Sequence, residues 1–351
     1  MKAVIFERFG GPEVMEYRDV PTPEVGPDDV LVEVHAVTVN RALDIHVRES
    51  GDGRKPTLPL VLGVDPTGVI VGVGANVPQS RIGERVACAA SVRCGTCGAC
   101  EDGRPNDCVA TQHLGIHRWG GYAEYVRIPA NCTMPLPDNL DFAEAAVIFR
   151  HFPTAFHLLD TKAGLKAGET ALVMGAAGGL GNALVQVAKY RGARVIGAAG
   201  TDAGVALAKE LGADEGVNYR SEDLEKRVNE LTRGRGVNVV FENIGAPDLW
   251  NAAFNSLGGG GRLVTAGAHG GGTVTLDVKR LYRRKLSVIG GAGSNPRDIE
   301  ATIESAASGR LRAAIDRVLP LSEVAEAHRL VNDRVVTGKV VLVPERVLAL
   351  H

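Results

Sequence analysis

The pattern of hydrophobic and polar positions changes once along the chain. Up to about residue 135, short runs of alternating apolar residues, such as 30–39 and 69–73, are separated by glycine- and proline-rich turns. This pattern predicts an antiparallel β domain. From about residue 170, apolar strands alternate with helical segments, which predicts a parallel sheet with helices on both faces. The strands predicted in this part are residues 171–175, 193–199, 238–245 and 261–268.

The chain ends with two further helices and a strand. The helices are predicted at residues 299–309 and 321–333, and the closing strand at 338–344. A length of 351 residues favours two domains of roughly 150 residues each. The fold class predicted from these patterns is α/β.

A glycine-rich turn marks the start of the second pattern. It follows the strand that ends at Met174 and precedes a helix, and this order is typical of a dinucleotide site. Glycines allow a tight turn and close approach of the backbone, and the helix N-terminus offers N–H groups to a pyrophosphate. A plain strand-turn-helix connection is the alternative. The candidate cofactor residues are Gly175, Ala177, Gly178, Gly179, Leu180 and Gly181.

The end of the next strand bears on the choice of cofactor. An NAD site of this type places a carboxylate about twenty residues after the turn, to bind the ribose 2′-OH. That position falls near Gly200, where the chain has no carboxylate. Thr201, Tyr219 and Arg220 are candidate donors to a 2′-phosphate, whereas Asp202 would favour NADH. The sequence therefore predicts NADPH, with NADH as the alternative.

Charge and the N-terminal residues limit the choice of partner. Lys and Arg number 39, Asp and Glu number 41, and the net charge of −2 argues against nucleic acid or an anionic membrane as a partner. The first ten residues lack the apolar run of a signal peptide. Glycines, Asn182 and Gln186 interrupt the longest uncharged stretch, residues 171–188, which makes it a poor membrane span. We expect a cytoplasmic protein with a small-molecule substrate.

Four cysteines form a C-x2-C-x2-C-x7-C run: Cys94, Cys97, Cys100 and Cys108. Four thiolates on so short a segment can surround one Zn²⁺ and leave no position for water, which describes a structural site. Free thiols or two disulfides are the alternative, although bridges between cysteines three residues apart are strained. We predict one structural zinc per chain. Cys88 and Cys132 stand outside the run and are expected to be buried apolar residues.

Together with the cysteine run and the glycine turn, four segments carry a family resemblance: GYAEYVRIP (121–129), GADEGVNYR (212–220), RLVTAGAHGG (262–271) and TGKVVLVP (337–344). The chain resembles the medium-chain dehydrogenase/reductase superfamily over essentially its full length, and most of all its quinone oxidoreductase and enoyl reductase branch. The resemblance implies a GroES-like β domain at residues 1–148 with the zinc lobe at 88–110, a Rossmann domain at 149–290, and a return to the first domain at 291–351. It also implies a homodimer or homotetramer associated through the edge strand of the Rossmann sheet.

Zinc-dependent alcohol dehydrogenases of this superfamily hold a catalytic zinc with a Cys, a His in a Gly-His-Glu segment, and a Cys or His four residues before a Thr. At the matching positions this chain has Asn40, Val64 and Arg150. These side chains are poor metal ligands, so the resemblance implies no catalytic zinc. A metal-free site suits the activated C=C bond of an α,β-unsaturated carbonyl or a quinone, because hydrogen-bond donors can stabilise the enolate. An alcohol or aldehyde dehydrogenase and a nucleotide-binding protein of low activity are the alternatives.

The resemblance extends to further site residues. The candidate catalytic residues are Asn40 or Arg150 as oxyanion donors, Asp44 in the same loop as Asn40, and Thr154 at the nicotinamide carboxamide. Arg48, His46 and His151 are weaker candidates, for which ion pairs or exposed positions are the alternative. Further cofactor contacts are expected at strand ends, from Asn243, Gly267, Ala268, His269, Gly290 and Gly291.

Overall fold

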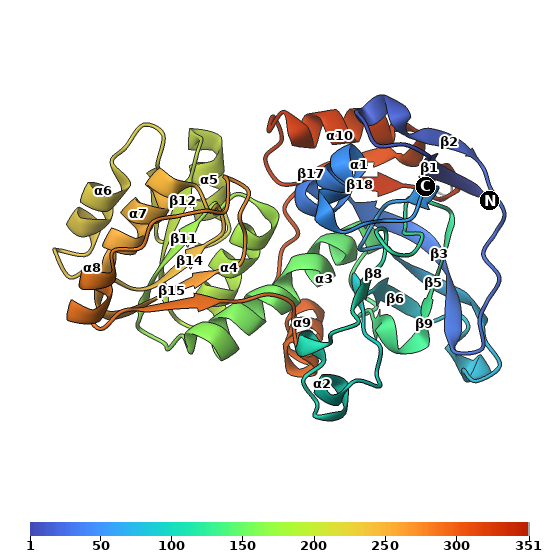
Figure 1. Ribbon diagram of the computed structural model, residues 1–351, viewed down its shortest axis with the longest axis horizontal. Helices are drawn as coiled ribbons and strands as arrows, with labels where there is room; N and C mark the ends of the chain where they lie inside the picture. Colours follow the sequence, from blue (N-terminus) through green and yellow to red (C-terminus); the bar gives the residue numbers. More distant parts are fainter. Residues whose placement is uncertain (350–351) are drawn as a thin grey trace. The chain divides into compact units, whose positions relative to one another are not determined.

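The computed structural model describes residues 1–349, and these residues form two compact units (Figure 1). Within the described residues, unit 1 contains residues 1–150 and 302–349, and unit 2 contains residues 151–301. The sequence placed the second domain at 149–290, whereas unit 2 extends to Ala301. The extension has a physical reason, because Asp298 lies 3.1 Å from the Nδ1 atom of His157, and both side chains are buried in unit 2.

Unit 1 is built on three sheets. The largest has the order β10-β6-β5-β3-β18-β17, with β9 also paired to β3. β2-β1-β4 and β7-β8 form the smaller sheets. The strands are β1 (Lys2–Phe6), β2 (Glu16–Asp19), β3 (Asp29–Thr38), β4 (Leu60–Val61), β5 (Thr67–Val73), β6 (Arg85–Cys88), β7 (Ser91–Val92), β8 (Gln112–His113), β9 (Tyr125–Pro129), β10 (Thr133–Pro135), β17 (Ile315–Pro320) and β18 (Lys339–Val343).

The alternation predicted for this part is clearest in β3, where Val30, Val32 and Val34 are fully buried and the residues between them are partly exposed. These valines pack with Ile70 and Val86 in the core of the sheet. The antiparallel prediction holds for most pairs, but β17 and β18 run parallel. They are parallel because helix α10 (Val324–Asn332) connects them and reverses the chain direction between them.

β18 joins two distant parts of the sequence, since it pairs antiparallel with β3 and sets Val341 opposite Thr38. In Figure 1 the red strand β18 lies next to the blue strand β3. The remaining helices of this unit are α1 (His46–Ser50), α2 (Gly98–Glu101), most of α3 (Phe142–Phe156), the end of α9 (Pro296–Ala307) and α11 (Glu345–Leu348).

Unit 2 is a parallel sheet of six strands in the order β13-β12-β11-β14-β15-β16. Its central strand β11 is buried along almost its whole length, as expected for a strand with helices on both faces. The strands are β11 (Thr170–Met174), β12 (Arg194–Ala199), β13 (Glu215–Asn218), β14 (Val237–Glu242), β15 (Leu257–Thr265) and β16 (Ser287–Gly290). The helices are α4 (Gly179–Tyr190), α5 (Asp202–Glu210), α6 (Leu224–Leu231), α7 (Pro247–Asn255), α8 (Val278–Arg283) and the start of α9.

Two features of residues 1–349 bear on the choice of partner. β16 is an edge strand of the unit 2 sheet, and Val288 in it is 38% exposed, so the expected surface for association is accessible in a single chain. No helix in this range combines the length and the apolar character needed to cross a bilayer.

Candidate active site

The glycine turn of unit 2 lies between β11 and α4, as predicted. Gly175 has φ +65°, a left-handed conformation that favours glycine. A Cβ atom on Gly181 would lie 2.0 Å from the carbonyl oxygen of Gly175, so only glycine allows this approach. A Cβ on Gly179 would lie 2.3 Å from Nε2 of His151, which places the imidazole of His151 against the turn. The turn and the N-terminus of the 12-residue helix α4 form a cradle suited to a pyrophosphate.

The strand-end residues meet at the carboxyl ends of β14 and β15. Asn243 donates from Nδ2 to the carbonyl oxygen of Met174 at 3.1 Å, and its side chain is 8% exposed. Within residues 1–349, its Oδ1 atom accepts no hydrogen bond. A Cβ on Gly267 would lie 2.6 Å from the carbonyl oxygen of Asn243, so the chain approaches closely here. This cradle and its unpartnered acceptor fit a nicotinamide dinucleotide.

Glu242 is a residue that the sequence analysis missed. It is fully buried, and its carboxylate accepts hydrogen bonds from the backbone N–H groups of Ile244 at 2.9 Å and Gly245 at 3.0 Å. Burial raises the pKa of this carboxyl group. Glu242 thus holds the turn that presents Asn243. An acidic residue at the end of an apolar strand was the available signal.

Other predicted cofactor residues lie in the same unit but differ in burial. His269 and Ala268 are exposed on the loop after β15. Gly291 donates to the carbonyl oxygen of Thr265 at 2.9 Å, and a Cβ there would lie 2.4 Å from Leu158. Gly290 has open space at its Cβ position, so its backbone does not require glycine for steric reasons.

The residues that the sequence selected near the end of β12 lie close to one another. Thr201 caps α5 by accepting a hydrogen bond from Gly204 N at 3.1 Å. A Cβ on Gly200 would lie 3.0 Å from the hydroxyl of Tyr219, so Thr201 and Tyr219 border the same place. Asp202 accepts a hydrogen bond from Asn218 Nδ2 at 2.7 Å. Arg220 is exposed just after Tyr219. This end of the sheet therefore combines an engaged carboxylate with an accessible cation.

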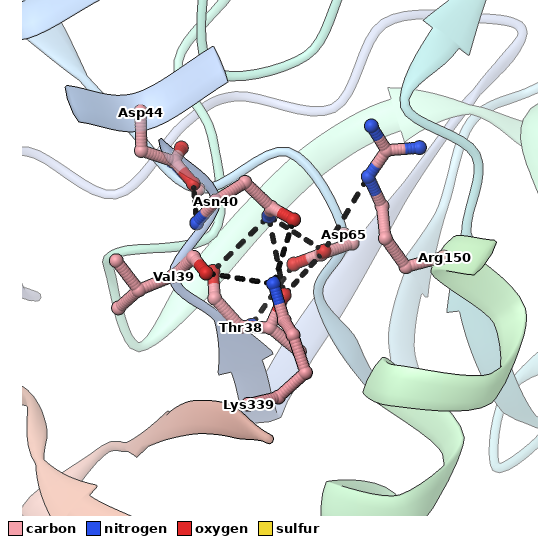
Figure 2. Close-up of polar contacts among 8 residues, drawn as sticks. Thr38, Val39, Asn40, Asp44, Asp65, Arg150 and Lys339 are labelled. Carbon is pink, nitrogen blue, oxygen red and sulfur yellow. Dashed lines mark hydrogen bonds and ion pairs between the residues drawn. The ribbon is translucent and has the colours of Figure 1, made fainter. Parts of the chain in front are cut away.

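Unit 1 carries a second group of polar residues, centred on Asn40 (Figure 2). Asn40 is 5% exposed, and its Nδ2 atom donates to Asp65 Oδ2 at 2.8 Å and to Thr38 Oγ1 at 3.1 Å. Its Oδ1 atom accepts from Lys339 Nζ at 2.9 Å. Asp65 and Lys339, which the sequence analysis did not select, thus surround Asn40. Both amide hydrogens of Asn40 are engaged within the protein.

Lys339 reaches this cluster from β18. It lies 299 residues from Asn40 in sequence, and the pairing of β18 with β3 brings it there. Its ammonium group also donates to the carbonyl oxygen of Val39 at 2.7 Å. Burial lowers the pKa of Lys339 to about 8, and attraction by Asp65 offsets this only in part.

Asp44 lies at the back of the cluster and is fully buried. It accepts hydrogen bonds from Asn40 N at 2.7 Å and from Gly63 N at 3.1 Å. Burial, followed by repulsion from Asp65, raises the pKa of Asp44 to about 7. Arg48, for which an ion pair was the alternative to a role in the site, pairs with Glu49 at 2.9 Å and also donates to His328. The imidazole of His46, at the start of α1, takes no part in the hydrogen bonds recorded for this cluster in the described chain.

Arg150 forms the other edge of the cluster. Its Nε atom lies 3.8 Å from Asp65 Oδ2, and its side chain is 24% exposed. Figure 2 shows its two terminal nitrogens directed away from Asp65. Across residues 1–349, these nitrogens donate to no recorded protein acceptor. Thr154 follows four residues later on α3 and therefore lies on the same face of that helix.

The four cysteines of the run come together in unit 1. Their sulfur atoms all lie within 4.8 Å of one another, with 3.6 Å between Cys97 and Cys100 and 3.5 Å between Cys94 and Cys108. Four sulfurs at about 2.3 Å from one zinc in a tetrahedron would be about 3.8 Å apart, so the cluster is close to that geometry. The backbone N–H of Cys94 also donates to Cys108 Sγ at 3.4 Å, a contact that favours the thiolate. The residues fit a structural zinc.

Comparison with known proteins gives consistent matches along the chain. Residues 26–138 match the family described as alcohol dehydrogenase GroES-like domain, and residues 179–308 match that described as zinc-binding dehydrogenase. The chain is 34% identical to D-arabitol-phosphate dehydrogenase of Enterococcus avium, over 93% of this chain and 92% of that protein. It is 30% identical to quinone oxidoreductase of Homo sapiens, over 97% of each. A solved structure of an NAD-dependent alcohol dehydrogenase has a TM-score of 0.91 and 40% identity, over 98% of this chain and 99% of that one.

Proposed function

The chain belongs to the medium-chain dehydrogenase/reductase superfamily and is an oxidoreductase of that type, and from this premise we propose that it uses NADPH to reduce an activated C=C bond. The substrate class is an α,β-unsaturated carbonyl compound or a quinone. No catalytic zinc takes part. The relatives include both quinone oxidoreductases and alcohol dehydrogenases, so the proposal depends on the residues of this chain.

The observation that carries the proposal is the chemistry of the polar cluster in unit 1. Val64, one of the three residues at the zinc-ligand positions, is a fully buried apolar side chain. Asn40 has its amide engaged with Asp65, Thr38 and Lys339. Two cations, Arg150 and Lys339, face the same carboxylate of Asp65. A zinc ion placed there would find only the Asp65 carboxylate, which is already engaged with Thr38 and Asn40, and would be repelled by both cations, so these residues do not fit a catalytic metal.

Arg150 is the residue best suited to stabilise the developing negative charge. Its Nε atom faces Asp65 at 3.8 Å, a distance for charge attraction and not for a hydrogen bond, and the terminal nitrogens point away from Asp65, toward the side on which we place a substrate oxygen. Of the two donors that the sequence selected, this geometry favours Arg150 over Asn40, because the amide hydrogens of Asn40 are already committed. A preorganised donor of this kind stabilises an enolate oxygen that bears charge only late in the reaction.

The reaction balances with the reduced cofactor, the substrate and one proton from water. NADPH, when bound in unit 2, supplies the hydride. A hydride delivered to the β-carbon of the conjugated carbonyl would move the C=C electrons to the α-carbon and oxygen, and Arg150 would donate hydrogen bonds to that oxygen. A proton from water then completes the saturated carbonyl product. An isolated ketone or aldehyde lacks this delocalisation and needs a stronger electrophile.

A tracing experiment tests the reaction. NADPH carrying deuterium at its transferable position is mixed with a cyclic enone, and the product is examined by NMR. We expect deuterium at the β-carbon of a saturated ketone and little turnover of the corresponding saturated ketone as substrate. Deuterium at the carbonyl carbon of an allylic alcohol would identify a carbonyl reductase. Tight NADPH binding without turnover of enones, quinones or aldehydes would instead indicate a nucleotide-binding protein of low activity.

Cofactor preference is a separate prediction. Replacing Arg220 by alanine is expected to raise the KM for NADPH about tenfold or more and to leave the KM for NADH nearly unchanged, because a hydrogen bond to a charged phosphate is lost. Lys226→Ala is the matched control, since Lys226 is another exposed cation of unit 2, on α6. Steady-state kinetics with both cofactors make the measurement. Equal efficiency of the unmodified protein with NADH would contradict NADPH preference.

A further inference from the structure

A buried chain of polar side chains lies behind the cluster of unit 1. Arg48 is 1% exposed, and His328 on α10 and Tyr122 before β9 are fully buried. Arg48 NH1 lies 3.1 Å from His328 Nδ1, and Tyr122 Oη lies 3.2 Å from His328 Nε2. Arg48 also donates to Gly10 O at 3.1 Å. None of these side chains has a role in the reaction described above.

The direction of these hydrogen bonds follows from the chemistry of arginine, which only donates. His328 Nδ1 must therefore accept from Arg48, and the ring is neutral with its proton on Nε2. That proton is donated to the oxygen of Tyr122, whose own O–H then points to a further acceptor. We assign that acceptor to the carboxylate of Asp44, because Gly63, whose N–H donates to Asp44, packs so closely on Tyr122 that a Cβ there would lie 2.6 Å from the Tyr122 ring. Burial first, and then the charge of Asp44, raise the pKa of Tyr122. Burial and the nearby Arg48 lower the pKa of His328 to about 3, which keeps the ring neutral.

Asp44 is the end point of the chain and connects two backbone segments of the site. It accepts from the N–H of Asn40, just after β3, and from the N–H of Gly63, just before Val64 and Asp65. The charged groups that face Asp44 are Asp65, which repels its carboxylate, and Lys339, which attracts it. The two backbone N–H groups and the assigned Tyr122 hydroxyl give Asp44 three donors, and an ionised carboxylate can accept all of them.

We propose that Arg48, His328 and Tyr122 are positioning residues that favour the ionised form of Asp44 and thereby hold the Asn40 and Gly63 backbones in the arrangement of the site. They act through Asp44 and do not touch the substrate. The benefit to catalysis rests on the proposed function, whereas the effect on Asp44 can be measured without a substrate.

The effect on stability has a defined sign. The pKa of Asp44 is raised to about 7 in the folded protein, from an ordinary value of about 4, so the folded state binds the proton more tightly. The contribution of Asp44 to stability is therefore present at low pH and is lost as the pH rises to about 7. Tyr122→Phe removes one donor to the ionised form of Asp44. The pH at which Asp44 loses its proton in the folded protein should therefore rise by about one unit.

The first experiment compares the unfolding temperature of Tyr122→Phe and the unmodified protein from pH 5 to pH 9. We expect Tyr122→Phe to lower the unfolding temperature more at pH 9 than at pH 5. Tyr125→Phe is the matched control, because the hydroxyl of this half-buried tyrosine accepts from Arg346 at 3.2 Å and is not bonded to Arg48, His328 or Tyr122. The decrease in unfolding temperature that it causes should be the same at every pH. In Asp44→Asn, which cannot titrate, the pH dependence near 7 should disappear. A loss in Tyr122→Phe that is the same at every pH would overturn the proposal.

A second pair of variants tests the hydrogen-bonded series Arg48–His328–Tyr122 without altering Tyr122. His328→Gln keeps an acceptor for Arg48 and a donor for Tyr122, whereas His328→Leu keeps neither. We expect His328→Gln to retain the pH dependence of the unmodified protein and His328→Leu to shift it as Tyr122→Phe does. Identical behaviour of the two variants would overturn the proposal.

The activity arm separates this proposal from the proposed function. With an enone as substrate, kcat should fall as the pH decreases through about 7, and the midpoint should lie about one unit higher in Tyr122→Phe. If Tyr122→Phe were active and the midpoint of its kcat–pH profile did not shift, the polar side chains behind Asp44 would have no effect on the reaction. If the unmodified protein reduces no enone or quinone, the proposed function fails, and the unfolding measurements still decide the effect on Asp44.

Discussion

Replacing Arg150 by alanine is expected to lower kcat for enone reduction by about 10²–10³, the usual cost of removing one preorganised oxyanion donor. NADPH affinity should stay nearly unchanged, because the proposed cofactor cradle consists of residues of unit 2, such as Gly181 and Asn243. Asn40→Ala should also lower kcat, in this case because Asp65 and Lys339 lose the amide that connects them. Steady-state kinetics and a direct cofactor-binding measurement make the test.

Two controls make the Arg150 result specific. Arg150→Lys keeps the charge but not the planar fork, so partial activity is expected. Arg127→Ala removes an arginine of β9 whose side chain is 44% exposed, and should leave kcat within about twofold. If Arg150→Ala turned over the enone as fast as the unmodified protein, another group would have to stabilise the enolate.

Loss of one cysteine ligand is expected to have the largest effect on stability. Cys100→Ser should lower the free energy of unfolding by several kcal/mol as an order of magnitude, because metal-binding energy is folding energy in a lobe of this kind. The protein should contain one zinc per chain before the substitution and clearly less after it. Elemental analysis and thermal unfolding make the measurement.

The matched control for the zinc lobe is Cys132→Ser. Cys132 is a buried cysteine outside the run, and its sulfur contacts Asn131 at 3.4 Å, so zinc content should not change. Two zinc ions per chain would contradict the single structural site. Loss of activity on chelation, with the fold intact, would contradict the separation of zinc from catalysis.

The glycine turn between β11 and α4 could be predicted because its signals are local. A strand, a glycine turn and a helix follow one another within about twenty residues, and each glycine answers a local constraint such as the approach of Gly181 to Gly175. The lack of a carboxylate at Gly200 was also a local observation. Glu242 was missed because its partners are backbone N–H groups, which a sequence does not distinguish.

The polar cluster of unit 1 could be predicted only in part. Asn40, Asp44 and Arg150 were selected, but Asn40 was expected to donate to a substrate, and its amide is instead engaged within the protein. Asp65 and Lys339 were not selected. A lysine that opens an apolar strand normally marks a solvent-exposed strand end, and nothing in its neighbours indicates that Lys339 is buried.

The sequence by itself determined the α/β class, the glycine turn and the four-cysteine run, because each depends on residues that are close together along the chain. Only the tertiary structure decided which distant residues meet. The pairing of β18 with β3 brings Lys339 to Asn40, and the position of α10 brings His328 between Arg48 and Tyr122. Local periodicity shows which face of a strand is buried but not which distant strand it pairs with, and for strands about 300 residues apart the packing of the whole sheet decides that partner.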